Sequence, residues 1–220
     1  MSYTRGTSAN IIVGAAALFT FEGGEMTDAD LPAATTNVSY KEALTADAEF
    51  RNVGYTSNGL ELQFQPDFGE VKVDQVLDVA KLYKQGMQVN LATAFAEATL
   101  ENLLIAIASP ANKLTKDVKM DNPLEAGTTN FADVLDLTAG DIGECPVERG
   151  LVAVGPGTGD CAAGSTIERI YVAYRALSIE NVTVSAKRDE PSMFEVSFRL
   201  LPANNGSYGK IVDRTVNSTT

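Results

Sequence analysis

The sequence offers few side chains that could carry out chemistry. Cys145 and Cys161 are its two thiols, and it contains no histidine and no tryptophan. Histidine is the commonest general base and the commonest imidazole ligand of metals, so most catalytic and metal-binding arrangements are missing. Two cysteines alone do not make a zinc site. They are either unpaired thiols in a reducing compartment or a disulfide across the glycine-rich segment between them.

Two other patterns could be taken for a catalytic or ligand-binding motif. The carboxylates of Asp189, Glu190 and Glu195 could act as an acid pair, but a run of charges is more typical of a solvated surface. Segment 155–166 has the glycine spacing of a phosphate loop, but Ser165 stands where that motif needs lysine. We therefore expect no catalytic residue, no cofactor and no metal, and a protein that is not an enzyme.

Length and charge narrow the class of protein. A chain of 220 residues can bury a sizeable core, and we expect one domain over residues 1–220. The net charge is −12, whereas a surface that grips nucleic acid needs clustered lysine and arginine. An acidic surface past which nucleic acid slides is still compatible with this charge. The apolar run 11–18 is too short to span a membrane, and we expect neither a targeting segment nor a membrane partner.

Alternating apolar and polar side chains predict a mainly β fold. Leu60, Leu62 and Phe64 share one side of a strand that follows the predicted turn Asn58-Gly59, and segment 66–69 is expected to break it. Segment 170–176 is apolar on both faces and is expected to be a central strand. Further strands are predicted at 11–19, 87–95, 135–139, 151–154, 182–186, 194–200 and 210–216.

One helix is predicted over residues 98–109. Thr99 is a candidate N-cap, Glu101 suits the positive end of the helix dipole, and Ser109 precedes a proline that ends the helix. We expect an apolar stripe on this helix to seal the apolar faces of the strands. The stripe consists of four residues at helical spacing: Leu100, Leu103, Leu104 and Ile107.

Four segments are expected to lie at the surface as arms or loops. They are the N-terminal arm (1–10), a long loop (25–48), a hairpin or arm (70–86) and the C-terminal tail (210–220). The third of these keeps apolar side chains that the core does not explain, so it is a candidate for assembly contacts. Its candidate contact residues are Asp74, Val76, Leu77 and Tyr83.

Three segments together resemble the major tail protein, or tail tube protein, of long-tailed, siphovirus-type bacteriophages. They are residues 67–75, 96–104 and 194–213. The resemblance covers most of the chain and implies two packed β-sheets, as a sandwich or half-barrel, flanked by one α-helix. It implies six subunits to a ring, rings stacked into a tube, and passage of DNA into the host. It also implies assembly in the bacterial cytoplasm, a place in the virion tail, and tail terminator, tip and tape-measure proteins as partners.

Strand alternation predicts which side chains would line such a tube. If six copies close their inner strands into a barrel, the side chains opposite the core face point into the lumen. The candidates are Glu61, Gln63, Gln65, Gln88 and Asn90. They are acidic or neutral, so DNA would find no strong site at which to stall. The alternative orientation has these residues facing outer solvent.

A second function stays open at this point. A monomeric β-sandwich binding module, such as a virion decoration or adhesion domain, could use loop 25–48 for its contacts. Rings or tubes of purified protein would favour the tube subunit, and persistent monomers would favour the binding module.

Overall fold

The computed structural model describes residues 12–33, 37–75, 78–121, 129–138, 145–158, 165–184, 188–189 and 191–217. Antiparallel strands predominate in this part of the chain, which confirms the mainly β prediction. The described helices are α1 (Tyr40–Ala46), α2 (Leu100–Ala106) and a 3-10 turn, η2 (Ala111–Lys113).

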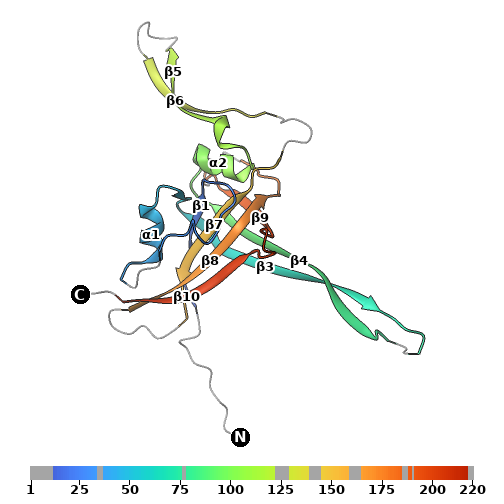
Figure 1. The fold of residues 1–220 in the computed structure, drawn as a ribbon. Helices are drawn as coiled ribbons and strands as arrows, with labels where there is room; N and C mark the ends of the chain where they lie inside the picture. Colours follow the sequence, from blue (N-terminus) through green and yellow to red (C-terminus); the bar gives the residue numbers. More distant parts are fainter. Residues whose placement is uncertain are drawn as a thin grey trace.

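Eight strands form one large sheet with the order β2-β1-β7-β8-β9-β4-β3, and β10 also pairs with β8. Their bounds are β1 (Ala17–Phe21), β2 (Phe50–Asn52), β3 (Thr56–Val71), β4 (Lys81–Phe95), β7 (Arg149–Pro156), β8 (Ser165–Ser178), β9 (Phe194–Leu201) and β10 (Gly209–Asn217). A separate two-stranded sheet consists of β5 (Leu114–Asp121) and β6 (Thr129–Leu135), and it extends away from the core beyond α2 (Figure 1).

Strand β8 joins two halves of the large sheet. Its first part pairs with β7 on one edge and with β10 on the other. Its last four residues pair with β9, on the edge that β10 occupies earlier in the strand. One hydrophobic cluster then connects Leu18 of β1 and Leu151 of β7 with Val89 of β4. The expected pair of packed sheets is therefore wrong in detail: the packed layers are halves of one sheet, and the second sheet is the small β5-β6 hairpin.

A second hydrophobic cluster covers the opposite face of β1, β7 and β8. It contains Phe19, Val152 and Ile170 from the strands and Tyr40 and Leu44 from α1. The middle of β8 is thus buried on both faces, because Ala173 belongs to the first cluster and Val172 to the second. This confirms the prediction of a central strand at 170–176.

Helix α1 lies inside the segment that was expected to be a long loop, so that prediction is wrong there. The helix has two turns, and only Tyr40 and Leu44 are buried, so it is too short to show a period in the sequence. The buried carboxylate of Glu168, on β8, accepts hydrogen bonds from Ser39 Oγ and, at 3.0 Å, from the Tyr40 N–H. The guanidinium of Arg214, on β10, lies 5.6 Å from the centre of the Tyr40 ring. These contacts fix α1 on the sheet.

Helix α2 forms within the predicted range, and Thr99 accepts a hydrogen bond from the Asn102 N–H as its N-cap. The predicted stripe is only partly correct. Leu104 is buried and Leu103 packs against the first cluster, but Leu100 is half-buried and Ile107 lies beyond the helix end, 38% exposed. The most buried side chains are instead those of Asn102, Ile105 and Ala106. The spacing of apolar residues could not predict this buried face of α2, because Asn102, which belongs to it, is polar.

Several predicted strand limits are also wrong. Segment 66–69 does not break β3, because β3 is the edge strand of the sheet, where the missing N–H of Pro66 is tolerated. Asn58 and Gly59 both have positive φ and form a bulge inside β3 rather than a turn. Residues 182–184 and 136–138 are not in strands, and 12–16 precede β1. The strand predicted at 210–216 is confirmed as β10, which pairs with β8 up to Asn217, so the segment expected as a tail (210–220) is mostly strand.

The burial of α2 leads to a stability prediction. Ile105→Ala should lower the free energy of unfolding by about 2–4 kcal/mol, because Ile105 is 2% exposed and its removal leaves a cavity between α2 and the sheet. Urea denaturation followed by circular dichroism measures the change. Ile107→Ala is the control and should cost less than about 1 kcal/mol, since its side chain is partly in solvent. Equal losses in both variants would contradict this packing.

Candidate functional site

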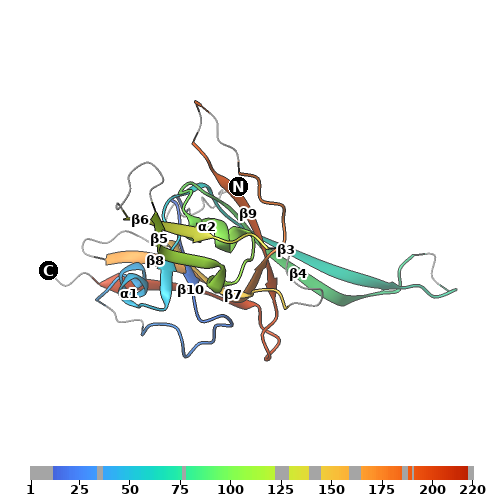
Figure 2. The same ribbon diagram turned by 90° about the horizontal axis from the view of Figure 1, so that it is seen from above.

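The most prominent surface feature is a long hairpin that extends from the core. Strands β3 and β4 pair from Thr56↔Phe95 to Val71↔Lys81, and their outer part projects away from every other element (Figures 1 and 2). We call residues 66–86 of this hairpin the arm. A register shift between Asp67 and Phe68 lies near the base of the arm. The hairpin predicted at 70–86 is therefore correct, although it starts earlier in the chain.

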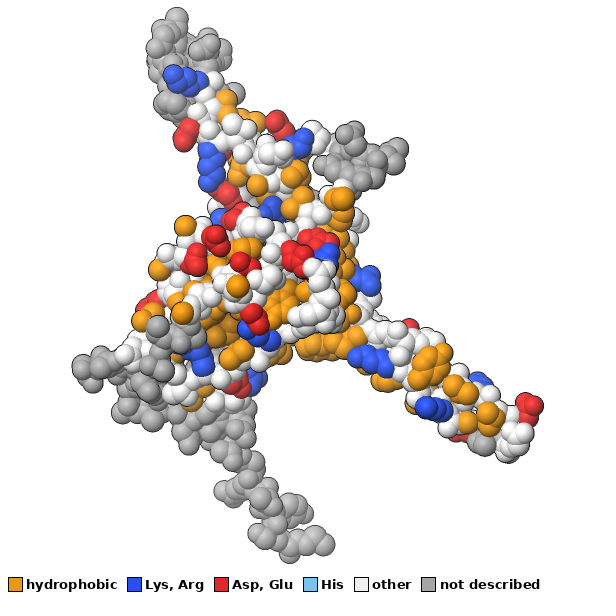
Figure 3. Space-filling model, viewed as in Figure 1, with side chains coloured by type: hydrophobic (Ala, Val, Ile, Leu, Met, Phe, Trp, Pro, Cys, Tyr) orange, Lys and Arg blue, Asp and Glu red, His pale blue; other side chains and the backbone are white. Residues whose placement is uncertain are grey.

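The arm exposes large apolar side chains. Leu82 is 59% exposed, and the apolar atoms follow the length of the arm in Figure 3. Among the described residues of the arm and its turn, the exposed large apolar residues are Phe68, Val71, Val73, Leu82 and Tyr83. Single apolar side chains on a surface are normal, but a row of them on a projecting element marks an interaction site.

Side chains of β3 and β4 contact one another on both faces of the arm. Gln85 donates a hydrogen bond of 3.0 Å from Nε2 to the Tyr83 hydroxyl, and these two side chains lie over Gly69. A Cβ at Gly69 would come within 2.6 Å of the Tyr83 ring, so a larger residue there would displace the outer ends of these two side chains. On the other face, Phe68 pairs with Lys84 and the next row pairs Glu70 with Leu82, so Phe68 and Leu82 lie diagonally across one face.

Of the four predicted contact residues, Asp74 and Tyr83 are exposed on the arm, which is the expected position. Val76 and Leu77 lie outside the described residues, as does the N-terminal arm (1–10). Their contribution to assembly stays a prediction.

An apolar groove begins where the arm leaves the core. It has a volume of about 330 Å³ and lies between the β3-β4 hairpin and the strands β8 and β10. Phe64 and Met87 line it from the hairpin, and Tyr171 and Ile211 line it from the opposite side. The Tyr208 hydroxyl donates a 2.7 Å hydrogen bond to the Met87 carbonyl and fixes one end of the groove. Phe64 and Ile211 are more than half exposed, so the groove is open to solvent.

The opposite face of β3, β4 and β9, which we call the outer face, carries the predicted lumen residues. The register places Glu61 beside Ala92 and Ser197, Gln63 beside Asn90 and Arg199, and Gln65 beside Gln88. Gln63 donates a 2.8 Å hydrogen bond to Glu61, and Gln88 donates one of 3.3 Å to Asn90. All five predicted residues therefore share one face, and whether it faces a lumen stays a prediction.

Strand β9 adds residues to the outer face that the prediction did not include. Glu195 and Arg199 come from β9, which lies about a hundred residues further along the chain but next to β4 in the sheet. A shallow pocket of about 250 Å³ collects Glu61, Glu180 and Glu195 at one end of this face. The outer face is thus mainly amide and hydroxyl, with carboxylates at one end and a single guanidinium in the described part of β9.

The remaining candidates for catalysis or metal binding do not form a cluster in the described part of the chain. Asp189 is exposed, Glu195 belongs to the outer face, and Glu190 lies outside the described residues. Cys145 is an exposed free thiol, and Cys161 is not described. Within the described residues, no group of three or more Cys, Asp or Glu side chains could hold a metal ion.

Comparison with known proteins gives no relative: no protein-family model matches the chain, and no curated protein matches it. None of the described helices has both the length and the apolar character needed to cross a bilayer.

Proposed function

We propose that this protein is the structural subunit of a phage tail tube, which assembles into hexameric rings that stack into a conduit for DNA. The observation that carries the proposal is the arm, a projecting hairpin whose apolar side chains no part of its own described chain covers. The resemblance of segments 67–75, 96–104 and 194–213 to tail tube proteins supports the same function.

The positions of the arm and the groove favour ring formation. The arm extends from Phe64 and Met87, which are themselves a wall of the groove, so it cannot enter the groove of its own chain. Two different apolar surfaces on one subunit favour head-to-tail contacts between copies. Head-to-tail contacts produce rings when the rotation closes, and open filaments when it does not.

The outer face suits the wall of a DNA conduit. In a ring, it would present amides and hydroxyls, which bind phosphates weakly, and six copies of Glu61 would repel DNA within the Debye length of ~8–10 Å. Arg199 beside Asn90 is the cation on this face, and Glu195, four residues earlier on the same strand, offsets its charge. DNA would therefore pass through without specific binding.

The remaining parts of the proposal come from the resemblance. The subunit would have no enzymatic activity and no cofactor, would assemble in the host bacterial cytoplasm, and would reside in the virion tail. Its partners would be its own copies, the tail terminator, and the tip and tape-measure proteins.

Negative-stain microscopy and analytical ultracentrifugation of the purified protein test the proposal. The expected result is rings or tubes of constant diameter that form above a threshold concentration. Monomers at every concentration and salt condition would refute self-assembly and favour the monomeric binding module.

Glu61→Lys tests the orientation of the outer face. Particles that carry this variant should have tubes of normal appearance and should release DNA poorly, because a ring of lysines attracts phosphates. Infectivity and DNA ejection assays measure the loss, which should exceed about tenfold. Glu49→Lys is the control, because Glu49 is exposed on a different part of the surface. Normal infection by both variants would remove Glu61 from the conduit wall.

A further inference from the structure

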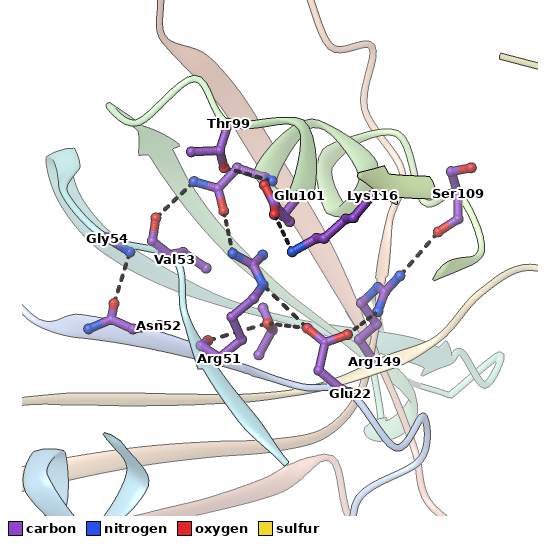
Figure 4. Close-up of polar contacts among 12 residues, drawn as sticks. Glu22, Arg51, Asn52, Val53, Gly54, Thr99, Glu101, Ser109, Lys116 and Arg149 are labelled. Carbon is purple, nitrogen blue, oxygen red and sulfur yellow. Dashed lines mark hydrogen bonds and ion pairs between the residues drawn. The ribbon is translucent and has the colours of Figure 1, made fainter. Parts of the chain in front are cut away.

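A second pocket lies between α2 and β5, on the side of the core away from the arm. Its volume is about 490 Å³. One wall is apolar and consists of Leu104, Ile105 and Leu114, and the rest is charged, with Arg51 and Lys116 among its lining residues. The charged lining residues lie close together below α2 in Figure 4 and are Glu22, Arg51, Glu101 and Lys116.

Among the described residues around this pocket, the two arginines do not each have a carboxylate of their own. The Glu22 carboxylate is shared by two guanidiniums, at 3.3 Å from Arg51 Nε and 3.6 Å from Arg149 Nη1. Lys116 and Glu101 form a separate pair at 2.7 Å, which lowers the pKa of Glu101 and raises that of Lys116. Arg51 and Arg149 therefore share one carboxylate, whereas Lys116 and Glu101 form a complete pair.

Two donors in this cluster lack partners. Arg149 is only 5% exposed, and its Nη2 donates to the Ser109 carbonyl at 3.1 Å. Arg51 Nη1 donates to Asn102 Oδ1 at 3.1 Å. Arg149 Nε and Arg51 Nη2 are buried and have no acceptor among the described residues. A buried donor without an acceptor is unfavourable, and burial also lowers the pKa of Arg149.

We propose that this pocket is an oxyanion site that binds a carboxylate or a phosphate. The oxyanion pairs with Arg51, which lines the pocket and is partly exposed, so that it can turn towards a ligand. Glu22 is then released to pair with Arg149 alone, through Nη1, and no longer divides its charge between two guanidiniums. The Arg51 Nη2 donor, which has no acceptor among the described residues, gains one in the ligand, and the apolar wall contacts the carbon part of the ligand.

Binding of inorganic phosphate to unassembled subunits tests this site. Isothermal titration at constant ionic strength, with chloride as the replaced ion, should give saturable binding. Arg51→Gln should abolish it, and Lys41→Gln, which removes a charge from the exposed side of α1, should leave it unchanged. Glu22→Gln should tighten it by about tenfold, because the competing carboxylate is gone. A gain of affinity cannot result from misfolding.

The same variants distinguish the source of the oxyanion. If Arg51→Gln subunits stop assembling, the ligand is a carboxylate of a second copy. If they assemble like the wild type, the ligand is a free oxyanion. The site itself is overturned if wild type, Arg51→Gln and Glu22→Gln bind phosphate alike. Because the titration uses unassembled subunits, that result is independent of whether tubes form.

Discussion

Asn102→Leu should lower the free energy of unfolding by about 3–5 kcal/mol, although the two side chains are similar in size. Asn102 is 1% exposed and links α2 to the edge of the large sheet. Its Nδ2 donates to the Val53 carbonyl at 2.8 Å and to the Glu97 carbonyl at 2.9 Å, and its Oδ1 accepts from Arg51. Leucine leaves these three groups without partners in a buried place, and each then costs about 1–3 kcal/mol.

Urea denaturation of the subunit measures this loss as a lower midpoint with an unchanged slope. Asn112→Leu is the matched control, because Asn112 is exposed in η2 and its replacement should change stability by less than about 0.5 kcal/mol. A loss below about 1 kcal/mol for Asn102→Leu would contradict this prediction. It would show that water, or a shift of the backbone, satisfies the three groups that the Asn102 amide bonds.

Leu82→Asp should prevent assembly while leaving the subunit folded. Leu82 is the most exposed of the large apolar side chains in the described part of the arm, so the isolated fold does not depend on it, and the thermal midpoint should stay within about 2 °C of the wild type. If a neighbouring copy covers the arm, the new carboxylate is desolvated without a partner. The concentration needed for tubes should then rise at least about tenfold, as measured by sedimentation.

Gln75→Asp adds the same charge to the same arm at a polar, exposed position and should assemble like the wild type. Tubes of Leu82→Asp at the wild-type concentration would exclude the arm from the interface. A lower thermal midpoint for this variant would instead place Leu82 in the core of the subunit.

Local patterns were sufficient to predict much of the β3-β4 region and of α2. The alternation around Leu62 and Val89 predicted both strands, and Thr99 predicted the start of the helix, because these signals depend on residues a few positions apart. The five outer-face residues also follow from alternation alone, since a strand places every second side chain on the same face.

The sequence did not reveal the features that depend on partners distant in the chain. Asn102 is buried because the Val53 carbonyl, 49 residues earlier in the chain, offers an acceptor, and Pro66 stays in a strand because β3 is an edge. Neither reason is visible in the neighbouring residues.

By itself the sequence determined the β-rich class, the central strand at 170–176 and the absence of histidine chemistry, because composition and short-range periodicity are properties of the chain alone. Only the tertiary structure decided that the packed layers are two halves of one sheet, that Arg199 joins Glu61 on the outer face, and that Glu22, Arg51 and Arg149 meet under α2. Each of these depends on contacts between residues that are far apart in sequence, and such contacts arise from the burial of shared apolar faces rather than from any local pattern.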